Sequence, residues 1–386
     1  MQGSLLSQLF AYCEQHGASD IHLAPGLPPF FRLRGALETA PAFTVLTRQA
    51  VSDVAVELLD RMSGHGRETL LGQLEKRGSL DGACTSEGRG RYRFNVFRCQ
   101  SIATEKERSD NAPIPSLGVA IRLLEDRFRS LAELGLPQRL ESFCDLKDGL
   151  VIVSGPTGSG KSTTLATLLD QINRTRTGHI ITIEDPVEYI HTPQLCLVHQ
   201  RQVGLDTLGF NAALVDALRE DPDFILVGEI REQTTIRTAI TAAETGHLVF
   251  TTLHAGDCVG SVERLVSVFN SGEQETIRRQ LSLVLRGIVA QRLLTSERKD
   301  LPRHRIPVCE ILINTPAVAN LIATGKSAQI YSAMETGTPV GMQTLEQDLA
   351  RLALSGAISP ETALAMARNP DALQHRLVRK WKEIRS

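Results

Sequence analysis

Residues 155–162 read Gly-Pro-Thr-Gly-Ser-Gly-Lys-Ser, and this motif constrains the fold of the chain more than any other feature. An apolar run at 149–154 precedes it, and a helical pattern at 161–172 follows it. A glycine-rich loop between a strand and a helix can wrap a phosphate, because its backbone N–H groups and the helix amino terminus face the anion. The motif in this context predicts a P-loop nucleotide site rather than an ordinary glycine-rich turn.

Each part of this loop has an expected role at the nucleotide. Lys161 is expected to reach the β- and γ-phosphates of ATP, and Ser162 to ligate Mg²⁺. The nucleotide-binding set comprises Gly155, Pro156, Thr157, Gly158, Ser159, Gly160, Lys161, Ser162 and Thr163. The chain has no Asn-Lys-x-Asp motif for reading guanine and no segment that resembles the substrate lid of a small-molecule kinase. Both of those enzyme classes are therefore disfavoured.

Apolar strand-like runs alternate with helical patterns downstream of residue 147. Strands are expected at 149–154, 179–184, 224–227 and 247–253, and helices at 161–172, 210–219 and 234–243. Such alternation is typical of a parallel sheet with helices on both faces, which places the chain in the α/β class. Beyond residue 261 the pattern is mainly helical.

The first 125 residues have a different pattern, which predicts an α+β module. Strands are expected near 19–23, 30–34, 91–97 and 119–123, with a helix near 48–62. Residues 101–118 are rich in charge and contain two prolines, so they are predicted to form a solvated, mobile loop. The expected domains are 1–125, a linker at 126–135, an ATPase core at 136–260 and a helical region at 261–386.

Composition excludes several classes of protein. The 42 basic and 44 acidic residues nearly cancel, and only 4% of residues are aromatic, so nothing favours a specific nucleic-acid partner. The seven cysteines form no C-x-x-C pair, which disfavours a zinc ribbon and indicates reduced, buried thiols in a cytoplasmic protein. The start of the chain does not read as a signal peptide, and the apolar runs are strand-sized. Any membrane contact is therefore expected to be peripheral.

Carboxylates follow two of the expected strands. Glu184, Asp185 and Glu188 follow the first, and Glu229 ends a later, fully apolar one. Ligands bind at the carboxyl ends of strands in such sheets, so these groups could face a metal or a hydrolytic water. A solvated acidic turn is the alternative for the first group. His254 also ends an expected strand, which favours a functional role over the structural one usual for a lone histidine.

Four motifs together carry a family resemblance that extends over nearly the whole chain. They are the P-loop, Ile-Glu-Asp-Pro-x-Glu at 183–188, Asp-Pro-Asp-x-Ile-Leu-Val-Gly-Glu at 221–229 and Thr-Gly-His-x-x-x-x-Thr-Leu-His at 245–254. They resemble the motifs of secretion-type hexameric ATPases. Gln-Arg-Gln-Val-Gly at 200–204 and Thr-Ala-Ala-Glu-Thr-Gly-His at 241–247 narrow the resemblance to the PilT-type retraction ATPases of type IV pili, and Gly-Met-Gln-Thr-Leu at 341–345 resembles their C-terminal helical region.

This resemblance implies a PAS-like N-terminal domain and a RecA-like ATPase core with a C-terminal helical region. By motif, Glu188 is similar to the family's general base and Glu229 to its Walker B glutamate, which holds Mg²⁺ with Ser162, directly or through water. His247 and His254 resemble residues that sense the nucleotide. The arginines similar to the family's nucleotide contacts across domain or subunit interfaces are Arg91, Arg93 and Arg122.

The resemblance also implies partners and a location. It implies a homo-hexamer at the cytoplasmic side of the inner membrane, bound peripherally through a pilus platform protein, with a paralogous pilus ATPase as a further partner. Family members carry Ala-Ile-Arg-Asn-Leu-Ile-Arg-Glu near the C-terminus, whereas residues 317–324 here read Ala-Val-Ala-Asn-Leu-Ile-Ala-Thr. Both arginines and the glutamate are missing, which makes a divergent accessory retraction ATPase an alternative to the principal motor.

Three further alternatives stay open from the sequence alone. An ATPase of a conjugation or type IV secretion apparatus shares these motifs. A nucleic-acid translocase is disfavoured by the near-neutral charge, and a non-hydrolysing ring subunit is the third possibility. The basic amphipathic tail at 374–386 could contact lipid or a partner, although a terminal helix packed on its own domain is favoured.

Overall fold

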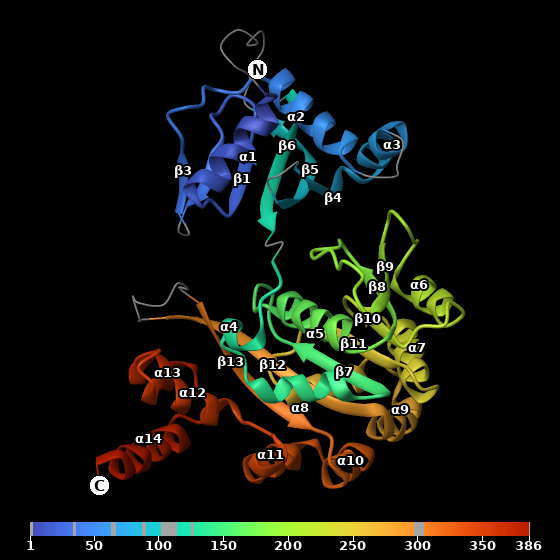
Figure 1. The fold of residues 1–386 in the computed structure, drawn as a ribbon, viewed down its shortest axis with the longest axis vertical. Coiled ribbons are helices and arrows are strands. Elements are labelled where there is room, and N and C mark those ends of the chain that lie inside the picture. The colour runs from blue at the N-terminus through green and yellow to red at the C-terminus, as the bar shows by residue number, and fades with distance from the viewer. Residues whose placement is uncertain are drawn as a thin grey trace. The chain divides into compact units, whose positions relative to one another are not determined.

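The computed structural model describes residues 3–33, 36–62, 67–86, 90–101, 114–124, 127–296 and 305–385. The chain divides into two compact units (Figure 1). The first comprises Met1–Arg127 together with Pro186–Ile190, and the second comprises Phe128–Asp185 and His191–Ser386. The segment Pro186–Ile190 thus belongs to the first unit, although it lies within the expected core in sequence.

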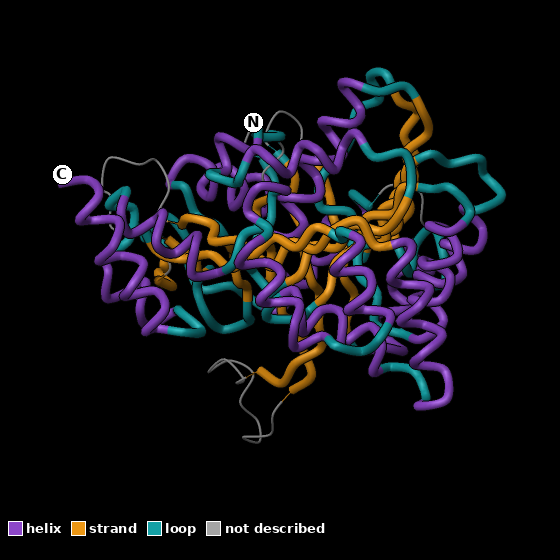
Figure 2. The backbone as a smooth tube through the Cα atoms, turned by 90° about the horizontal axis from the view of Figure 1, so that it is seen from below, coloured by secondary structure: helices purple, strands orange, loops and turns teal. Residues whose placement is uncertain are grey.

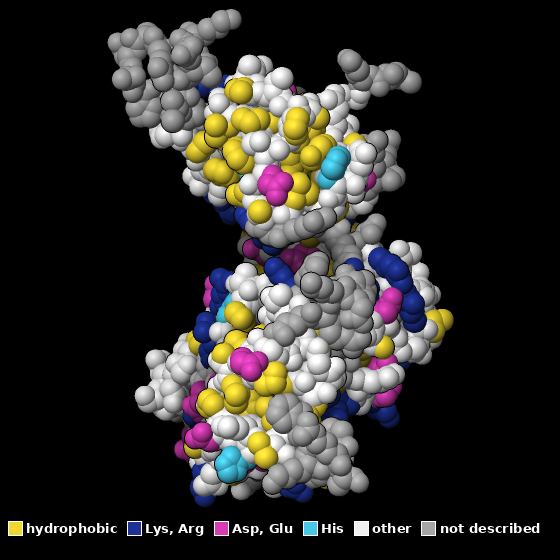
Figure 3. All heavy atoms as spheres, turned by 90° about the vertical axis from the view of Figure 1, so that its left-hand side faces the viewer, with side chains coloured by type: hydrophobic (Ala, Val, Ile, Leu, Met, Phe, Trp, Pro, Cys, Tyr) yellow, Lys and Arg dark blue, Asp and Glu magenta, His cyan; other side chains and the backbone are white. Residues whose placement is uncertain are grey.

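The first unit is a six-stranded antiparallel sheet with three helices, in strand order β3-β2-β1-β6-β5-β4. Its elements are α1 Leu5–His16, β1 Asp20–Leu23, β2 Phe30–Leu33, β3 Ala36–Thr39, α2 Arg48–Asp60, α3 Arg67–Arg77, β4 Ser79–Thr85, β5 Arg91–Ser101 and β6 Ile114–Leu124. The edge strand β3 is exposed along its whole length. Hydrophobic atoms are visible on one face of this unit in Figure 3.

Alternation along β5 explains how this sheet buries one face. Tyr92, Phe94 and Val96 are buried, and the intervening positions Arg91 and Arg93 point to the opposite face. The Tyr92 ring stacks on Phe10 of α1, with 3.7 Å between ring centroids. Apolar residues therefore fix the helices on one face, and the arginines lie on the other face.

The hairpin of β5 and β6 is longer than predicted, so the expected loop at 101–118 is partly wrong. β5 continues to Ser101 and β6 begins at Ile114, with Gln100 paired to Pro115. Pro115 fits this strand because β1 pairs with β6 only from Val119 onward, so the other side of β6 has no described strand partner there. Residues 102–113 of the expected loop lie outside the described residues.

The second unit is a seven-stranded sheet in the order β13-β12-β7-β11-β10-β8-β9. All neighbouring strands are parallel except β12 and β13, which are antiparallel. Its elements are α4 Leu131–Leu134, η1 Gln138–Asp145, β7 Gly149–Ser154, α5 Lys161–Thr175, β8 Gly178–Glu184, β9 Cys196–Gln202, α6 Phe210–Ala217, β10 Phe224–Val227, α7 Gln233–Glu244, β11 Leu248–Leu253, α8 Cys258–Ser267, α9 Ser271–Val284, β12 Leu285–Thr295, β13 Arg305–Ile313, α10 Pro316–Ala323, η2 Ser327–Gln329, α11 Ile330–Thr336, η3 Thr338–Val340, α12 Leu345–Leu354, α13 Pro360–Met366 and α14 Pro370–Arg385.

Both faces of this sheet are buried, as the alternating pattern predicted. Leu150 and Ile152 of β7 pack in the cluster that contains α6 to α11. Val151 and Val153 point the other way, into a cluster with α4, η1 and α5. Figure 2 shows the strands as a layer with helices along it. The prediction of an α/β sheet with helices on both faces is confirmed.

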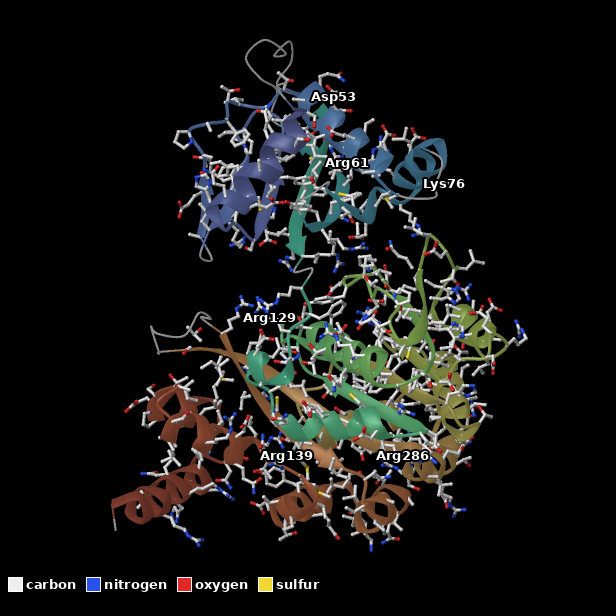
Figure 4. The ribbon with its side chains drawn as sticks, viewed as in Figure 1. Asp53, Arg61, Lys76, Arg129, Arg139 and Arg286 are labelled. Atoms are coloured by element: carbon white, nitrogen blue, oxygen red, sulfur yellow. The ribbon has the colours of Figure 1, made fainter. Side chains whose placement is uncertain are left out.

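Beyond residue 261 the described chain is mainly helical, as predicted, but it also contains two strands, β12 and β13, that the sequence pattern did not indicate. β12 reads Leu-Arg-Gly-Ile-Val-Ala-Gln-Arg-Leu-Leu-Thr and is paired on both sides, by β7 and β13. Its short apolar stretches, interrupted by Arg286, Gln291 and Arg292, have no period that separates a buried strand from a buried helix. At the amino end of β12, Arg286 (labelled in Figure 4) forms an ion pair at 2.5 Å with Asp148, the residue just before β7.

The C-terminal helices form a separate apolar cluster within the second unit. Leu373 and Leu377 of α14 are buried in it with residues of α12 and β13. The terminal helix therefore packs on its own domain, as favoured from the sequence. Arg368, just before α14, pairs with Asp257 at 3.3 Å and with Glu310 at 3.1 Å, which ties the start of this helix to α8 and β13.

A buried histidine predicts acid sensitivity of the second unit. His191 is 5% exposed, its ring lies 4.7 Å from that of Phe128, and burial lowers its pKa to about 4. The unfolded chain protonates this ring near pH 6.5, so it binds more protons than the folded chain as the pH falls. We expect this histidine alone to remove about 2 kcal/mol of stability between pH 7.5 and pH 5.

Urea unfolding of wild type and His191→Phe at both pH values measures this effect. Phenylalanine keeps an aromatic ring beside Phe128 but cannot take up a proton. The variant should therefore lose less stability on acidification than wild type, by the same ~2 kcal/mol. An equal loss in both proteins would contradict the assignment.

Candidate nucleotide site

The backbone of the P-loop has conformations at two positions that only glycine adopts easily. β7 is buried at all six positions and ends at Ser154, and α5 begins at Lys161. Gly155 has φ +146° and Gly160, the N-cap of α5, has φ +88°. A Cβ at Gly155 would lie 2.2 Å from the backbone oxygen of Gln291. The glycine spacing in the motif is thus required by the shape of the loop.

The loop fits a bound phosphate. Among the described residues, no side chain caps the amino terminus of the 15-residue helix α5. The Ser159 hydroxyl is buried and has no hydrogen-bond partner in that part of the chain. Lys161 is 9% exposed, and its Nζ donates to the carbonyls of Gly155 at 2.9 Å and Pro156 at 3.0 Å. A buried ammonium inside a loop at an uncapped helix terminus provides the charge and donors that an anion needs.

Glu229 and His254 meet at the same sheet edge as the P-loop. β10 and β11 are parallel neighbours, and Leu253 of β11 pairs with Ser154 of β7. His254 Nε2 lies 3.5 Å from Glu229 Oε2, and Arg231 Nη2 lies 2.7 Å from the same oxygen. The structure therefore brings Glu229 and His254 together, as predicted from their places after neighbouring strands.

The charge state of His254 follows from its surroundings. Burial lowers its pKa below the ordinary value, Lys161 and the arginines Arg231 and Arg264 lower it further, and Glu229 acts in the opposite direction. The ring is therefore neutral at pH 7. Arg231 and Arg264 were not singled out from the sequence. Its position two residues after Glu229 is the sequence signal that could have identified Arg231.

The acidic motif at 183–188 is divided between the two units. Glu184 stays with the sheet, where its Oε1 accepts from Thr182 Oγ1 at 2.7 Å and from Gln200 Nε2 at 3.2 Å. Glu188 belongs to the first unit, where Arg93 Nη1 lies 3.4 Å from its Oε1. Arg91 Nη2 donates to the carbonyl of Val187 at 3.0 Å. The predicted general base is thus held with two of the predicted arginines.

The third predicted arginine, Arg122, lies opposite Arg93 in the pairing of β5 and β6. Its Nε lies 2.7 Å from Asp20 Oδ1. Burial would raise the pKa of Asp20, but hydrogen bonds from Ser19 and Arg122 hold it below the ordinary value. Arg93 and Arg122 therefore both form ion pairs with carboxylates of the first unit.

His247 lies away from Glu229 and His254. It precedes β11, so it is at the amino end of the strand whose carboxyl end carries His254. Its Nδ1 lies 2.9 Å from the carbonyl oxygen of Ala242 and 3.2 Å from Thr245 Oγ1. Six strand residues separate the two histidines by roughly 20 Å. The structure therefore does not bring His247 to the P-loop edge of its own sheet.

The described residues contain neither a cluster of metal-binding side chains nor a helix that could span a membrane. No group of three or more His, Cys, Asp or Glu side chains in that part of the chain is arranged to hold a metal ion. All seven cysteines are free, and six of them are buried. No helix in the described ranges is long and apolar enough to cross a membrane.

The family profile described as Type II/IV secretion system protein matches residues 111–350. The chain belongs to this family. Within it, the chain is 41% identical over 366 residues to the type IV pilus retraction ATPase PilT of Pseudomonas aeruginosa, which covers 95% of this chain and 99% of PilT. It is 36% identical to the type IV pilus ATPase PilU of the same organism, over 93% of this chain and 88% of PilU.

Two solved ATPase structures are similar to this chain. A crystal structure of the pilus retraction motor PilT with bound ADP has a TM-score of 0.83 and 38% identity, covering 97% of this chain and all of that one. The Legionella pneumophila ATPase DotB has a TM-score of 0.74 at 24% identity, covering 93% of each chain, which indicates a shared fold. The resemblance to PilT-type ATPases predicted from the motifs is confirmed.

Proposed function

We propose that this chain is an ATP-hydrolysing motor that powers type IV pilus retraction. The observation that carries the proposal is the convergence of Lys161, Glu229 and His254 at one edge of the parallel sheet. The similarity to PilT over nearly the full length of both chains supports the same reading. The partners that the proposal includes are five further copies of this chain in a ring and a platform protein of the inner membrane, with the motor on the cytoplasmic side.

Each residue at the sheet edge has a different proposed role in ATP hydrolysis. Lys161 exchanges its bonds to the loop carbonyls for the β- and γ-phosphates of ATP. Glu229 orients the attacking water and accepts its proton, and neutral His254 lies close enough to contact that carboxylate. Ser162 and Glu229 would hold Mg²⁺, which neutralises charge on the phosphates when bound. The loop's uncapped helix terminus fits this assignment.

Glu188 and the arginines are proposed to act at the same nucleotide from the first unit. Arg91, Arg93 and Arg122 carry guanidinium groups, which stabilise charge that spreads over the transferred phosphoryl oxygens. Glu188 would serve as a second base once released from Arg93. Their ion pairs are partly exposed, with side-chain exposures of 37% for Arg93 and 29% for Glu188, so exchange of partners costs little.

One observation favours a second candidate, an accessory retraction ATPase. α10 carries the segment in which both family arginines are replaced, at Ala319 and Ala323. Val318 and Ile322 are fully buried in the core cluster, so the helix keeps its packing while its charged residues are gone. The similarity to PilU, a second pilus ATPase of Pseudomonas aeruginosa, fits this candidate.

Deletion in the native host tests the proposal, with pilus retraction, conjugation and secretion scored together. Loss of retraction alone, restored by the wild-type gene but not by Lys161→Ala, is the expected result. Loss of retraction only when a paralogous pilus ATPase is also deleted would identify the accessory role. Loss of conjugation or secretion with normal retraction would contradict the proposal.

A further inference from the structure

Gln291 lies beside the P-loop although it is more than a hundred residues away in sequence. β12 runs parallel to β7, and Ala290 pairs with Ser154, the last residue of β7. Gln291 is the next residue of β12, so it lies beside the end of β7, where the P-loop begins. It is a polar residue in the core, only 3% exposed.

Both ends of the Gln291 amide are used by the P-loop and the first turn of α5. Its Nε2 donates to the carbonyl of Ser159 at 2.7 Å, and its Oε1 accepts from Thr164 Oγ1 at 2.8 Å. A backbone carbonyl can only accept, so the Ser159 bond fixes which end of the amide faces the loop. Gln291 thus bridges the residues on either side of Gly160 and Lys161.

The backbone of the loop is also shaped against this residue. A Cβ at Gly155 would lie 2.2 Å from the Gln291 carbonyl oxygen, and a Cβ at Gly160 would lie 2.8 Å from Nε2. Two glycines of the motif are therefore required partly because Gln291 is close to them. The backbone carbonyl of Gln291 lies against Gly155, and its buried amide lies against Ser159 and Gly160, so this one residue restricts the conformations available to the glycine-rich segment.

We propose that Gln291 is a positioning residue for nucleotide binding and hydrolysis. Gln291 lies outside the P-loop motif from which the site was predicted, and it acts on the P-loop rather than directly on the nucleotide. By holding Ser159 and Thr164, it fixes the direction of the Lys161 side chain and of the backbone N–H groups before the nucleotide binds. The expected effect on turnover rests on the proposed ATPase function, whereas the expected effect on nucleotide binding does not.

The alternative is that Gln291 merely stabilises the fold, and Gln343 provides a matched control. Gln343 is 9% exposed, and its Nε2 donates to the carbonyl of Cys309 at 2.8 Å. Cys309 is the residue of β13 that pairs with Gln291. Both glutamines therefore supply a buried amide-to-carbonyl bond in the same region of the sheet, but no described hydrogen bond joins Gln343 to the P-loop.

The experiment compares the purified full chain with Gln291→Ala, Gln291→Glu and Gln343→Ala. ADP affinity is measured by calorimetry, KM and kcat with ATP, and stability by thermal unfolding. Gln291→Ala should raise the ADP Kd by roughly tenfold or more, because the Ser159 carbonyl loses the Gln291 donor and Thr164 Oγ1 keeps only its bond to the Gly160 carbonyl at 3.1 Å. Gln343→Ala should lower the melting temperature while its ADP Kd stays within about twofold of wild type.

Gln291→Glu keeps the size of the side chain and gives a readout that a purely structural role would not move. A protonated carboxyl can donate to the Ser159 carbonyl, whereas an ionised one repels it. The ratio of the variant's ADP Kd to that of wild type should therefore be larger at pH 8 than at pH 6. This variant also keeps the test decisive if Gln291→Ala does not fold.

The outcomes distinguish failure of the positioning role of Gln291 from failure of the proposed ATPase function. Wild-type ADP affinity in both Gln291 variants, or an equal loss in Gln343→Ala, would overturn the positioning role. Absence of ATP turnover in the wild-type chain would instead contradict the proposed function, and the comparison of ADP affinities would still decide the role of Gln291.

Discussion

Lys161→Ala is expected to abolish detectable ATP turnover, a loss of about 10²–10³-fold or more in kcat. The ammonium is 9% exposed and lies within the loop, where it contacts two backbone carbonyls. Alanine removes the only positive charge of the motif from the place where the phosphates would bind. The loss in rate should be accompanied by weaker nucleotide affinity, since the charge acts on the ground state and on the transition state.

Steady-state phosphate release by the purified chain measures this change. Lys326→Ala is the matched control, because Lys326 is an exposed lysine just after α10 and should leave turnover unchanged. Thermal unfolding of both variants checks that the fold survives. Turnover of Lys161→Ala within a few-fold of wild type would show that the P-loop is not the hydrolytic site.

Glu229→Gln is expected to lower kcat by about 10²–10⁴-fold while ADP affinity stays within a few-fold of wild type. Glutamine has the same shape as glutamate and can still accept from Arg231, which now lies 2.7 Å from the carboxylate. It cannot take a proton from water. The expected separation of binding from turnover distinguishes this residue from Lys161, whose loss affects both.

Single-turnover hydrolysis and ADP calorimetry on the same preparation measure the two effects. Glu275→Gln serves as the control, because Glu275 forms an ion pair with Arg279 on the surface and its side chain is 72% exposed. The assignment would fail if Glu229→Gln kept wild-type turnover, or if it lost ADP binding and turnover together.

The parts of this site that were predictable are those specified by local sequence. The P-loop needs left-handed backbone at Gly155 and Gly160, and such a requirement leaves a visible spacing of glycines. Glu229 and His254 each end an apolar run, and parallel strands bring their carboxyl ends to one edge. The order of parallel strands alone therefore predicts that these two side chains lie close together, and they are 3.5 Å apart.

The parts that were missed depend on contacts between distant segments. Gln291 belongs to a strand whose short apolar stretches did not separate strand from helix, and its partners lie at Ser159 and Thr164. The acidic motif was predicted as one cluster, yet Glu184 and Glu188 contact different units. His247 shares a motif with His254, but a strand between them places them at opposite ends.

Retraction of single labelled pili tests the central claim most directly, namely that ATP hydrolysis by this chain drives filament disassembly. A strain that lacks the chromosomal copy is complemented with the wild-type chain or with Glu229→Gln at equal protein levels, and filaments are followed by fluorescence microscopy. The wild-type chain should restore retraction, and Glu229→Gln should leave pili extended. Equal retraction with both chains would contradict the claim.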